Sequence, residues 1–255
     1  YNLTTVSLFI LLAIIYNLNS ISETSLFNES YKIDNLSNFM KLIMIVSGIF
    51  VMLTSSKYLQ ISKINKIEYP ILVLSAILGM MVMISSNDLI VFYMGLELQS
   101  LALYVLASFN RDNLLSTESG LKYFILSALS SGLLLYGCSL VYGFAETTNF
   151  NQILINSNNT EYGLTFGIVF ILVGLAFKIS AVPFHMWAPD VYQGSPTSVT
   201  IFFAILPKIA ALTVFIRFLY VPFVNMSDQW QIIIILISIA SMIFGAVAAI
   251  GQNNL

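Results

Sequence analysis

Residues 163–187 read GLTFGIVFILVGLAFKISAVPFHMW, and this stretch decides the class of fold. It is long enough to cross a bilayer as a helix, which takes about 20 mostly apolar residues. Its single lysine, Lys178, lies inside the apolar run, and Pro183 follows soon after it. Proline removes a helical hydrogen bond and kinks or breaks a helix. The stretch therefore predicts a membrane helix that is broken beside a buried lysine.

The composition of the whole chain also indicates a membrane protein. Of 255 residues, 58% are apolar and 9% are charged, and the mean hydropathy is +0.89. A soluble domain carries roughly 25% charged residues, and this chain has too few to cover a soluble surface. The apolar runs do not alternate as barrel strands do. We predict an all-α, polytopic bundle of about eight transmembrane helices, at 2–18, 38–55, 69–86, 88–109, 119–143, 163–187, 197–221 and 231–251.

The connections between the predicted helices are short and polar. The longest cover 19–37 and 146–162, so there is no room for a soluble domain, and 1–255 is predicted as a single membrane domain. Basic residues in short loops mark the matrix or cytoplasmic side of a membrane protein. Four such residues share one side of the predicted topology: Lys57, Lys63, Lys66 and Arg111.

Several classes of function are excluded by residue usage. A net charge of −2 leaves no basic face for nucleic acid. Cys138 is the only cysteine, which excludes an intrachain disulfide and a zinc or iron–sulfur site built from cysteines of this chain. The glycine-rich phosphate-binding patterns G-x-G-x-x-G and G-x-x-x-x-G-K-S/T do not occur, so we do not expect this chain to bind a nucleotide.

Three charged residues fall near the middle of predicted helices, namely Glu97, Lys178 and Lys208. A charge at this depth costs roughly 2.5–3.5 kcal/mol on insertion scales, so each must be paired or hydrated. Such residues usually mark an ion or proton path. The alternative is that they only hold helices together. We predict proton translocation, with Glu97 stabilising the protonated form of Lys178 when the two pair and releasing the proton when they separate.

Two further residues are candidate proton relays. Lys122 lies one turn inside its predicted helix, where it can also reach the membrane interface as an ordinary surface lysine. His185 is the only histidine and follows Pro183. Its ordinary pKa near 6.5 suits proton transfer, although a lone histidine is more often structural. No set of metal ligands accompanies it, so we expect no metal site.

Several stretches resemble subunit 2 of mitochondrial-type NADH dehydrogenase (ubiquinone). The helix GLELQSL at 95–101, which bears Glu97, is similar to the glutamate-bearing helix of that family. The stretch KISAVPFHMWAPDVY at 178–192 is closer still, and GLKYF at 120–124 and AILPK at 204–208 also match. The resemblance covers most of 36–252, whereas 1–35 is similar only in hydropathy.

The resemblance implies an antiporter-like subunit in the membrane arm of respiratory complex I. Such subunits translocate protons with a glutamate and two lysines, here Glu97, Lys178 and Lys208, and Lys122 belongs to the same polar axis. The implied location is the mitochondrial inner membrane, among other membrane-arm subunits and lipids. The implied cofactors of this chain are none, because NADH, FMN, iron–sulfur clusters and quinone belong to other subunits.

The chain departs from the family pattern at its end. Residues 69–221 correspond to the first antiporter-like repeat, and the second repeat is incomplete or absent before Leu255. We expect either a split gene, with a second polypeptide carrying the C-terminal half, or a truncated sequence. In both cases this chain alone does not complete the proton path.

Two other functions remain open on the sequence alone. A subunit of a cation/proton antiporter shares the same glutamate–lysine–lysine logic, although the long match at 178–192 favours the respiratory subunit. A structural scaffold with vestigial charges is the third possibility, and retention of all three buried charges argues against it. Replacement of Lys178 and Lys208 by Met distinguishes the scaffold, which would still support pumping.

Overall fold

The computed structural model describes residues 1–18, 23–156 and 162–251. Within this part of the chain it contains helices and one two-stranded antiparallel sheet. The strands are β1 (Thr24–Leu26) and β2 (Tyr31–Ile33). The helices are α1 (Asn2–Leu18), α2 (Asn35–Ile61), α3 (Glu68–Ile84), α4 (Leu89–Ala107), α5 (Leu114–Ala145), α6 (Phe150–Asn156), α7 (Tyr162–Ile179), α8 (Trp187–Gly194), α9 (Thr197–Tyr220) and α10 (Ser227–Gly251), with a 3-10 turn at Val224–Met226.

The long apolar helices confirm the predicted all-α membrane fold. Each predicted segment overlaps one long helix in the predicted order, and the segment 163–187 extends beyond the end of α7. Six helices of the described chain are long and apolar enough to cross a membrane, while α1 and α3 are apolar but have 17 residues each. At about 1.5 Å per residue such a helix is roughly 26 Å long, somewhat less than a hydrocarbon core of about 30 Å.

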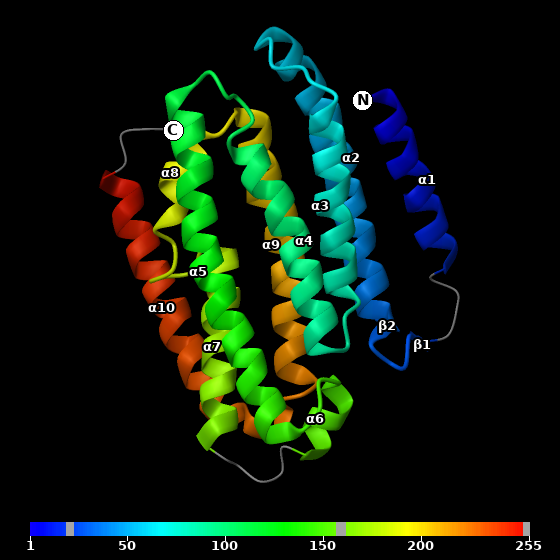
Figure 1. The fold of residues 1–255 in the computed structure, drawn as a ribbon, viewed down its shortest axis with the longest axis vertical. Helices are drawn as coiled ribbons and strands as arrows, with labels where there is room; N and C mark the ends of the chain where they lie inside the picture. Colours follow the sequence, from blue (N-terminus) through cyan, green and yellow to red (C-terminus); the bar gives the residue numbers. More distant parts are fainter. Residues whose placement is uncertain (19–22, 157–161, 252–255) are drawn as a thin grey trace.

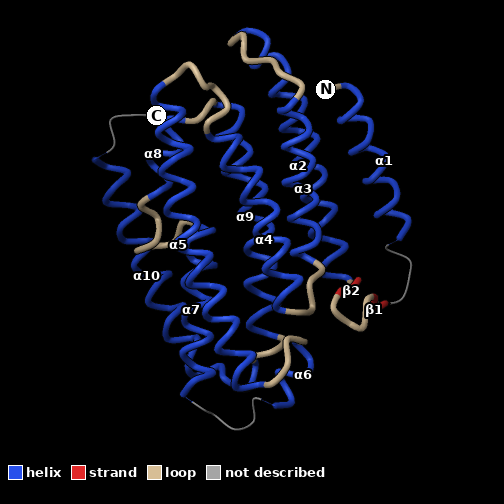
Figure 2. The backbone as a smooth tube through the Cα atoms, viewed as in Figure 1, coloured by secondary structure: helices blue, strands red, loops and turns tan. Residues whose placement is uncertain are grey.

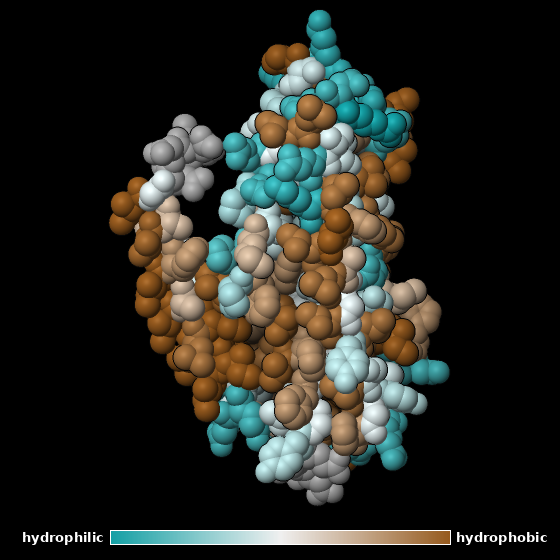
Figure 3. Space-filling model, turned by 60° about the vertical axis from the view of Figure 1, so that its left-hand side comes forward, coloured by the Kyte–Doolittle hydropathy of each residue, from teal (hydrophilic) through white to brown (hydrophobic). Residues whose placement is uncertain are grey.

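The helices run side by side, and their connections gather at two ends (Figure 1). The α2–α3 turn, which carries Lys63 and Lys66, and the α4–α5 turn, which carries Arg111, lie at the same end. Lys57, predicted to lie in a loop, belongs to the last part of α2 before this end. The hairpin of β1 and β2 lies toward the opposite end, and α6 lies there too. Figure 3 shows a broad hydrophobic zone between hydrophilic ends, as expected for a chain that crosses a bilayer.

Close helix contacts depend on glycine where backbones meet. A Cβ on Gly79 of α3 would lie 2.6 Å from the backbone nitrogen of Gln99 on α4, and one on Gly95 would lie 2.8 Å from that of Met83. These distances leave no room for any side chain. Small residues at helix interfaces let membrane helices approach, because dispersion rather than water exclusion drives their association.

The hairpin of β1 and β2 caps one end of the bundle, although the sequence predicted only a polar connection there. The Asn87 amide, after α3, donates to the Glu29 carbonyl at 2.9 Å, and the Asn87 backbone nitrogen donates to the Ser30 carbonyl at 2.9 Å. The Leu89 backbone nitrogen donates to the Thr148 carbonyl at 2.9 Å, which adds the segment before α6. These bonds satisfy backbone groups that would otherwise be costly to bury.

The predicted broken helix is present and defines the centre of the bundle. Helix α7 ends at Ile179, Ser180 adopts a left-handed φ of 60°, and α8 begins at Trp187. The range 163–187 is therefore a helix, a loop and the first residue of a second helix. Figure 2 shows this loop about half-way along the bundle, beside α10. Helix α9, in contrast, continues through Pro207 without a break.

Candidate functional site

Lys178 is held in a buried cage of hydroxyl groups at the end of α7. Lys178 is 4% exposed. Its Nζ donates to Ser100 Oγ of α4 at 2.8 Å and to Ser127 Oγ of α5 at 2.6 Å. The Tyr104 hydroxyl also donates to Ser127 Oγ, at 2.8 Å. Two helices, α4 and α5, thus supply hydroxyl groups around the ammonium group that α7 carries.

Lys208 of α9 reaches the same break from the other side. Its Nζ donates to Ser180 Oγ and, at 3.4 Å, to the backbone carbonyl of Lys178. The left-handed turn at Ser180 ends the helix, so this carbonyl is free to accept a bond from outside it. Nζ also lies 5.3 Å from the ring centroid of Trp187, a distance that suits a cation–π contact. One peptide carbonyl therefore links the two lysines.

Glu97 lies on the face of α4 that carries Ser100, because residues three apart in a helix are neighbours. Its Oε1 is buried and has no hydrogen-bond partner, and no ion pair joins Glu97 to Lys178 among the described residues. Gln99, which is 1% exposed, likewise has both amide atoms unpartnered. The structure therefore shows Glu97 and Lys178 without an ion pair between them.

His185 lies in the loop between α7 and α8. Its ring centroid is 4.7 Å from that of Phe244 on α10, and its buried Nδ1 has no hydrogen-bond partner. The neighbouring Val182 backbone nitrogen donates to Ser241 Oγ of α10 at 3.0 Å. The histidine thus faces α10 rather than the lysines. No group of three potential metal ligands occurs in the described chain.

Lys122 belongs to a separate, more exposed cluster. Its side chain is 41% exposed, and its Nζ contacts Asp190 of α8 at 2.7 Å and Glu118 of α5 at 2.8 Å. No hydrogen bond joins it to Lys178 or Lys208 in the described chain. The structure therefore brings the two buried lysines together at the break and places Lys122 at the edge of α8, where it ties α8 to α5.

The partners of the buried lysines were not identified from sequence. Ser100, Ser127, Tyr104 and Ser180 are common residues, and none of them carries a charge that would be costly in a membrane. Only the helix register could have suggested Ser100, since it follows Glu97 by three positions. The position of Trp187 is set by stacking on Tyr123 at 4.7 Å and by a bond from its Nε1 to the Phe177 carbonyl at 2.9 Å.

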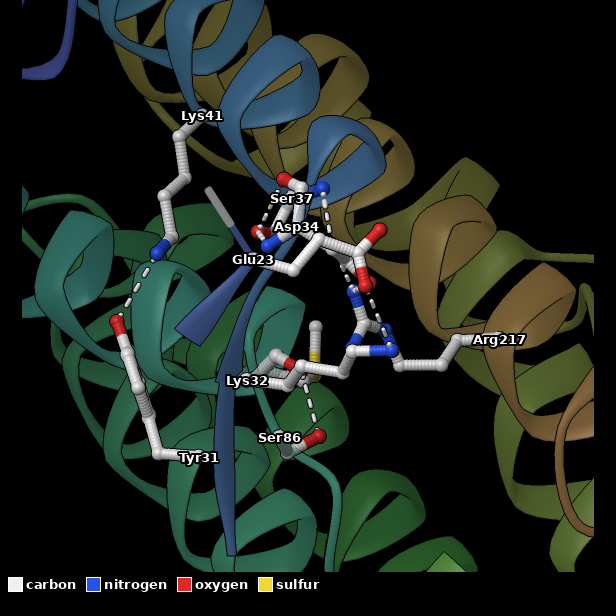
Figure 4. A network of polar contacts seen from close by, with 9 residues as sticks. Glu23, Tyr31, Lys32, Asp34, Ser37, Lys41, Ser86 and Arg217 are labelled. Carbon is white, nitrogen blue, oxygen red and sulfur yellow. Dashed lines mark hydrogen bonds and ion pairs between the residues drawn. The ribbon is translucent and has the colours of Figure 1, made fainter. Parts of the chain in front are cut away.

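A buried ion pair joins the far end of α9 to the start of α2 (Figure 4). Arg217, 3% exposed, donates from Nη2 to both carboxylate oxygens of Asp34, at 2.7 and 2.9 Å. Asp34 also caps α2, since its Oδ1 accepts from the Ser37 backbone nitrogen at 2.8 Å. Burial opposes ionisation of Asp34, yet the Arg217 charge and the Ser37 bonds lower its pKa from the ordinary value. Beside this pair, the buried Lys41 donates to the Tyr31 hydroxyl at 2.9 Å.

Comparison with known proteins places this arrangement in a family. Residues 86–255 match the family model described as NADH:quinone oxidoreductase/Mrp antiporter, transmembrane. The chain belongs to this family. The matched range includes Glu97, Lys122, Lys178, His185 and Lys208. It is a multi-pass, antiporter-like membrane protein, as its helices and its composition predict.

Relatives narrow the assignment within the family. The chain is 73% identical over its full length to NADH-quinone oxidoreductase subunit N of Pelagibacter ubique, and it spans 54% of that protein. It is similar to a chain of respiratory complex I from Thermus thermophilus with bound aureothin, at 30% identity and a TM-score of 0.72, over 84% of this chain and 46% of that one. It also shares its fold with a chain of the Mrp complex from Dietzia sp., at 22% identity and a TM-score of 0.84, over 98% and 49%. The chain thus spans about half the length of the relatives that it matches.

Proposed function

We propose that this chain is part of the membrane arm of a proton-translocating NADH:quinone oxidoreductase and that Lys178, Lys208 and Glu97 move the proton. The observation that carries the proposal is the break after Lys178. It places a buried ammonium in a cage of hydroxyls and leaves a free backbone carbonyl that binds a second lysine. Broken helices of this kind line ion sites in transporters.

The geometry supports a two-state transfer. Lys178 now bonds to Ser100 and Ser127, and Glu97, on the same helix face as Ser100, has one carboxylate oxygen, Oε1, without a hydrogen-bond partner. Rotation of the lysine side chain toward Glu97 exchanges neutral acceptors for a charged one and stabilises the protonated form. Return to the hydroxyl cage removes that stabilisation. The proton can then pass from Lys178 Nζ to the neutral Nζ of Lys208 across the break.

The supporting relatives favour the respiratory role over a cation/proton antiporter. The family includes both, and the relative that is 73% identical is named as a subunit of the oxidoreductase. The Mrp chain, at 22% identity, supports the fold alone. The two functions differ in what drives transport. Proton transport by the intact protein that requires NADH and proceeds without an added Na⁺ gradient indicates the respiratory role.

We expect the redox groups, NADH, FMN, iron–sulfur clusters and quinone, to be bound by other subunits of the same complex. The relatives extend over about twice the length of this chain, so we propose that the rest of the path comes from the second half of the protein, on this polypeptide or on another. The mitochondrial inner membrane stays a prediction. The bacterial sources of the relatives support a bacterial cytoplasmic membrane as the alternative.

The test is a charge-neutral substitution at Glu97 in the assembled complex. Glu97→Gln removes the carboxylate that would pair with Lys178 while keeping the shape of the side chain. We expect slower NADH-driven proton uptake in inverted vesicles with normal assembly. Glu146→Gln, at an exposed residue after α5, is the matched control and should pump normally. Equal pumping by both variants would exclude Glu97 from the transfer.

A further inference from the structure

A groove opens at the basic end of the molecule, away from the buried lysines. It has a volume of about 430 Å³ and lies between the start of α3 and the turn from α4 to α5. Its lining residues are Lys66, Glu68, Ile71, Val105, Phe109 and Arg111, together with Leu72, Ser108 and Thr117. Figure 1 shows that the two turns that border it lie at the same end of the bundle.

The two cations of the groove have no carboxylate partner. Lys66 and Arg111 are exposed, and neither forms an ion pair with any residue in the described ranges. Glu68 lies in the same groove and is also free of an ion pair within the same described ranges. Two cations and one carboxylate leave a net charge of +1, which a single phosphate diester neutralises.

The walls of the groove are apolar and face outward. Ile71 of α3 is 60% exposed and Val105 of α4 is 46% exposed, while Phe109 closes the groove from inside at 6% exposure. Both helices run from this end into the apolar zone of the bundle. The groove therefore changes from cationic to apolar along the membrane normal, as a phospholipid changes from phosphate to acyl chain.

We propose that this groove binds an anionic phospholipid, whose phosphate contacts Lys66 and Arg111. The acyl chain then lies against Ile71 and Val105. Basic pockets on the matrix or cytoplasmic side of membrane helices bind the headgroups of such lipids. The Glu68 carboxylate limits the site to a headgroup with one negative charge, because it repels a second one. This site is independent of the proposed proton path.

The test uses the intact protein purified from membranes and freed of lipid. A phosphatidylglycerol with a photoreactive acyl chain is titrated in, and the cross-linked peptides are mapped by mass spectrometry. We expect cross-links to α3 near Ile71 and to α4 near Val105. The double variant Lys66→Gln/Arg111→Gln should weaken this cross-linking about 25-fold, since each basic residue near an anionic surface contributes roughly fivefold.

Two further variants make the test specific. Lys57→Gln/Lys63→Gln removes two exposed charges of the same end that do not line the groove, and it should leave the cross-linking unchanged. Glu68→Gln should strengthen binding of phosphatidylglycerol. Equal losses in both double variants would overturn the site, as would cross-links elsewhere. If phosphatidylethanolamine instead labels the groove more strongly than phosphatidylglycerol and loses this labelling in Glu68→Gln, that result would show that the groove binds a zwitterionic lipid. Protection of the groove from labelling by another subunit would show that it binds a protein.

Discussion

Loss of the Arg217 charge should destabilise the fold far from the proton path. Arg217→Ala leaves the Asp34 carboxylate, whose side chain is 16% exposed, without its ionic partner. Removing one member of a buried pair costs about 3–5 kcal/mol, and the partial exposure of Asp34 favours the lower end, about 3 kcal/mol. At roughly 2–4 °C per kcal/mol for a chain of this size, the unfolding midpoint should fall by roughly 6–12 °C.

The buried cysteine of the chain can report thermal unfolding. Cys138 is the single cysteine and is 7% exposed, so a thiol-reactive fluorophore reports unfolding of the purified protein on heating. Lys57→Ala, which removes one positive charge at an exposed residue without an ion pair among the described residues, is the control and should shift the midpoint little. Equal midpoints for the two variants would refute the reasoning.

The same pair predicts how the loss depends on pH. The pKa of Asp34 is lower in the folded chain than in the unfolded chain. The stabilisation is therefore present above the unfolded value, about 3.9, and disappears as the pH falls through the folded value. The difference between wild type and Arg217→Ala should be full at pH 7 and shrink below about pH 4. The double variant Asp34→Asn/Arg217→Ala should recover part of the stability, because Asn still caps α2 and leaves no buried charge.

Other predictions follow from packing and from the hydroxyl cage. Gly79→Ala should lower stability by about 1–3 kcal/mol, because its Cβ meets the backbone of α4. Gly143→Ala, with nothing within 4 Å of the new Cβ, should be neutral or stabilising in the same thermal assay. Ser127→Ala removes one of the two acceptors of Lys178 and should slow NADH-driven proton uptake, whereas Ser139→Ala on the exposed face of α5 should not. Normal uptake in Ser127→Ala would show that the cage is dispensable.

The membrane fold could be predicted because long apolar segments are easily recognised in the sequence. A run of about 20 apolar residues is typical of a membrane helix and rare elsewhere, and the order of the helices follows from the chain. The break after Lys178 was predictable because Pro183 cannot continue the helix. Pro207 has a similar local signal, yet α9 stays continuous through it. Membrane helices tolerate proline where neighbouring groups satisfy the freed carbonyl, and this depends on packing that the sequence does not show.

The candidate site was only partly predictable. Glu97, Lys178 and Lys208 were identifiable because a charge in hydrocarbon is costly. Their distances were not, so the hydroxyl cage and the unpaired state of Glu97 emerged only from the structure. For Lys122 the role could not be predicted, since its sequence position suits both a proton relay and a surface ion pair. The structure shows it in an ion pair with Asp190.

The hairpin at 24–33 and the ion pair beside it could not be predicted from the sequence. Strands of three residues give too short a pattern to distinguish from a polar loop. Asp34 and Arg217 are 183 positions apart, and only the packing of α9 against α2 brings them together. Contacts between distant segments of this kind need the three-dimensional fold.

Lys178→Met in the assembled complex tests most directly whether Lys178 carries the translocated proton. The measurement is the number of protons taken up by inverted vesicles per NADH oxidised, with Lys57→Met, at an exposed lysine of α2, as the control. We expect proton uptake to fall sharply in Lys178→Met and to stay normal in Lys57→Met, with both complexes assembled. An unchanged ratio and rate in Lys178→Met would contradict a role for this lysine as the proton carrier.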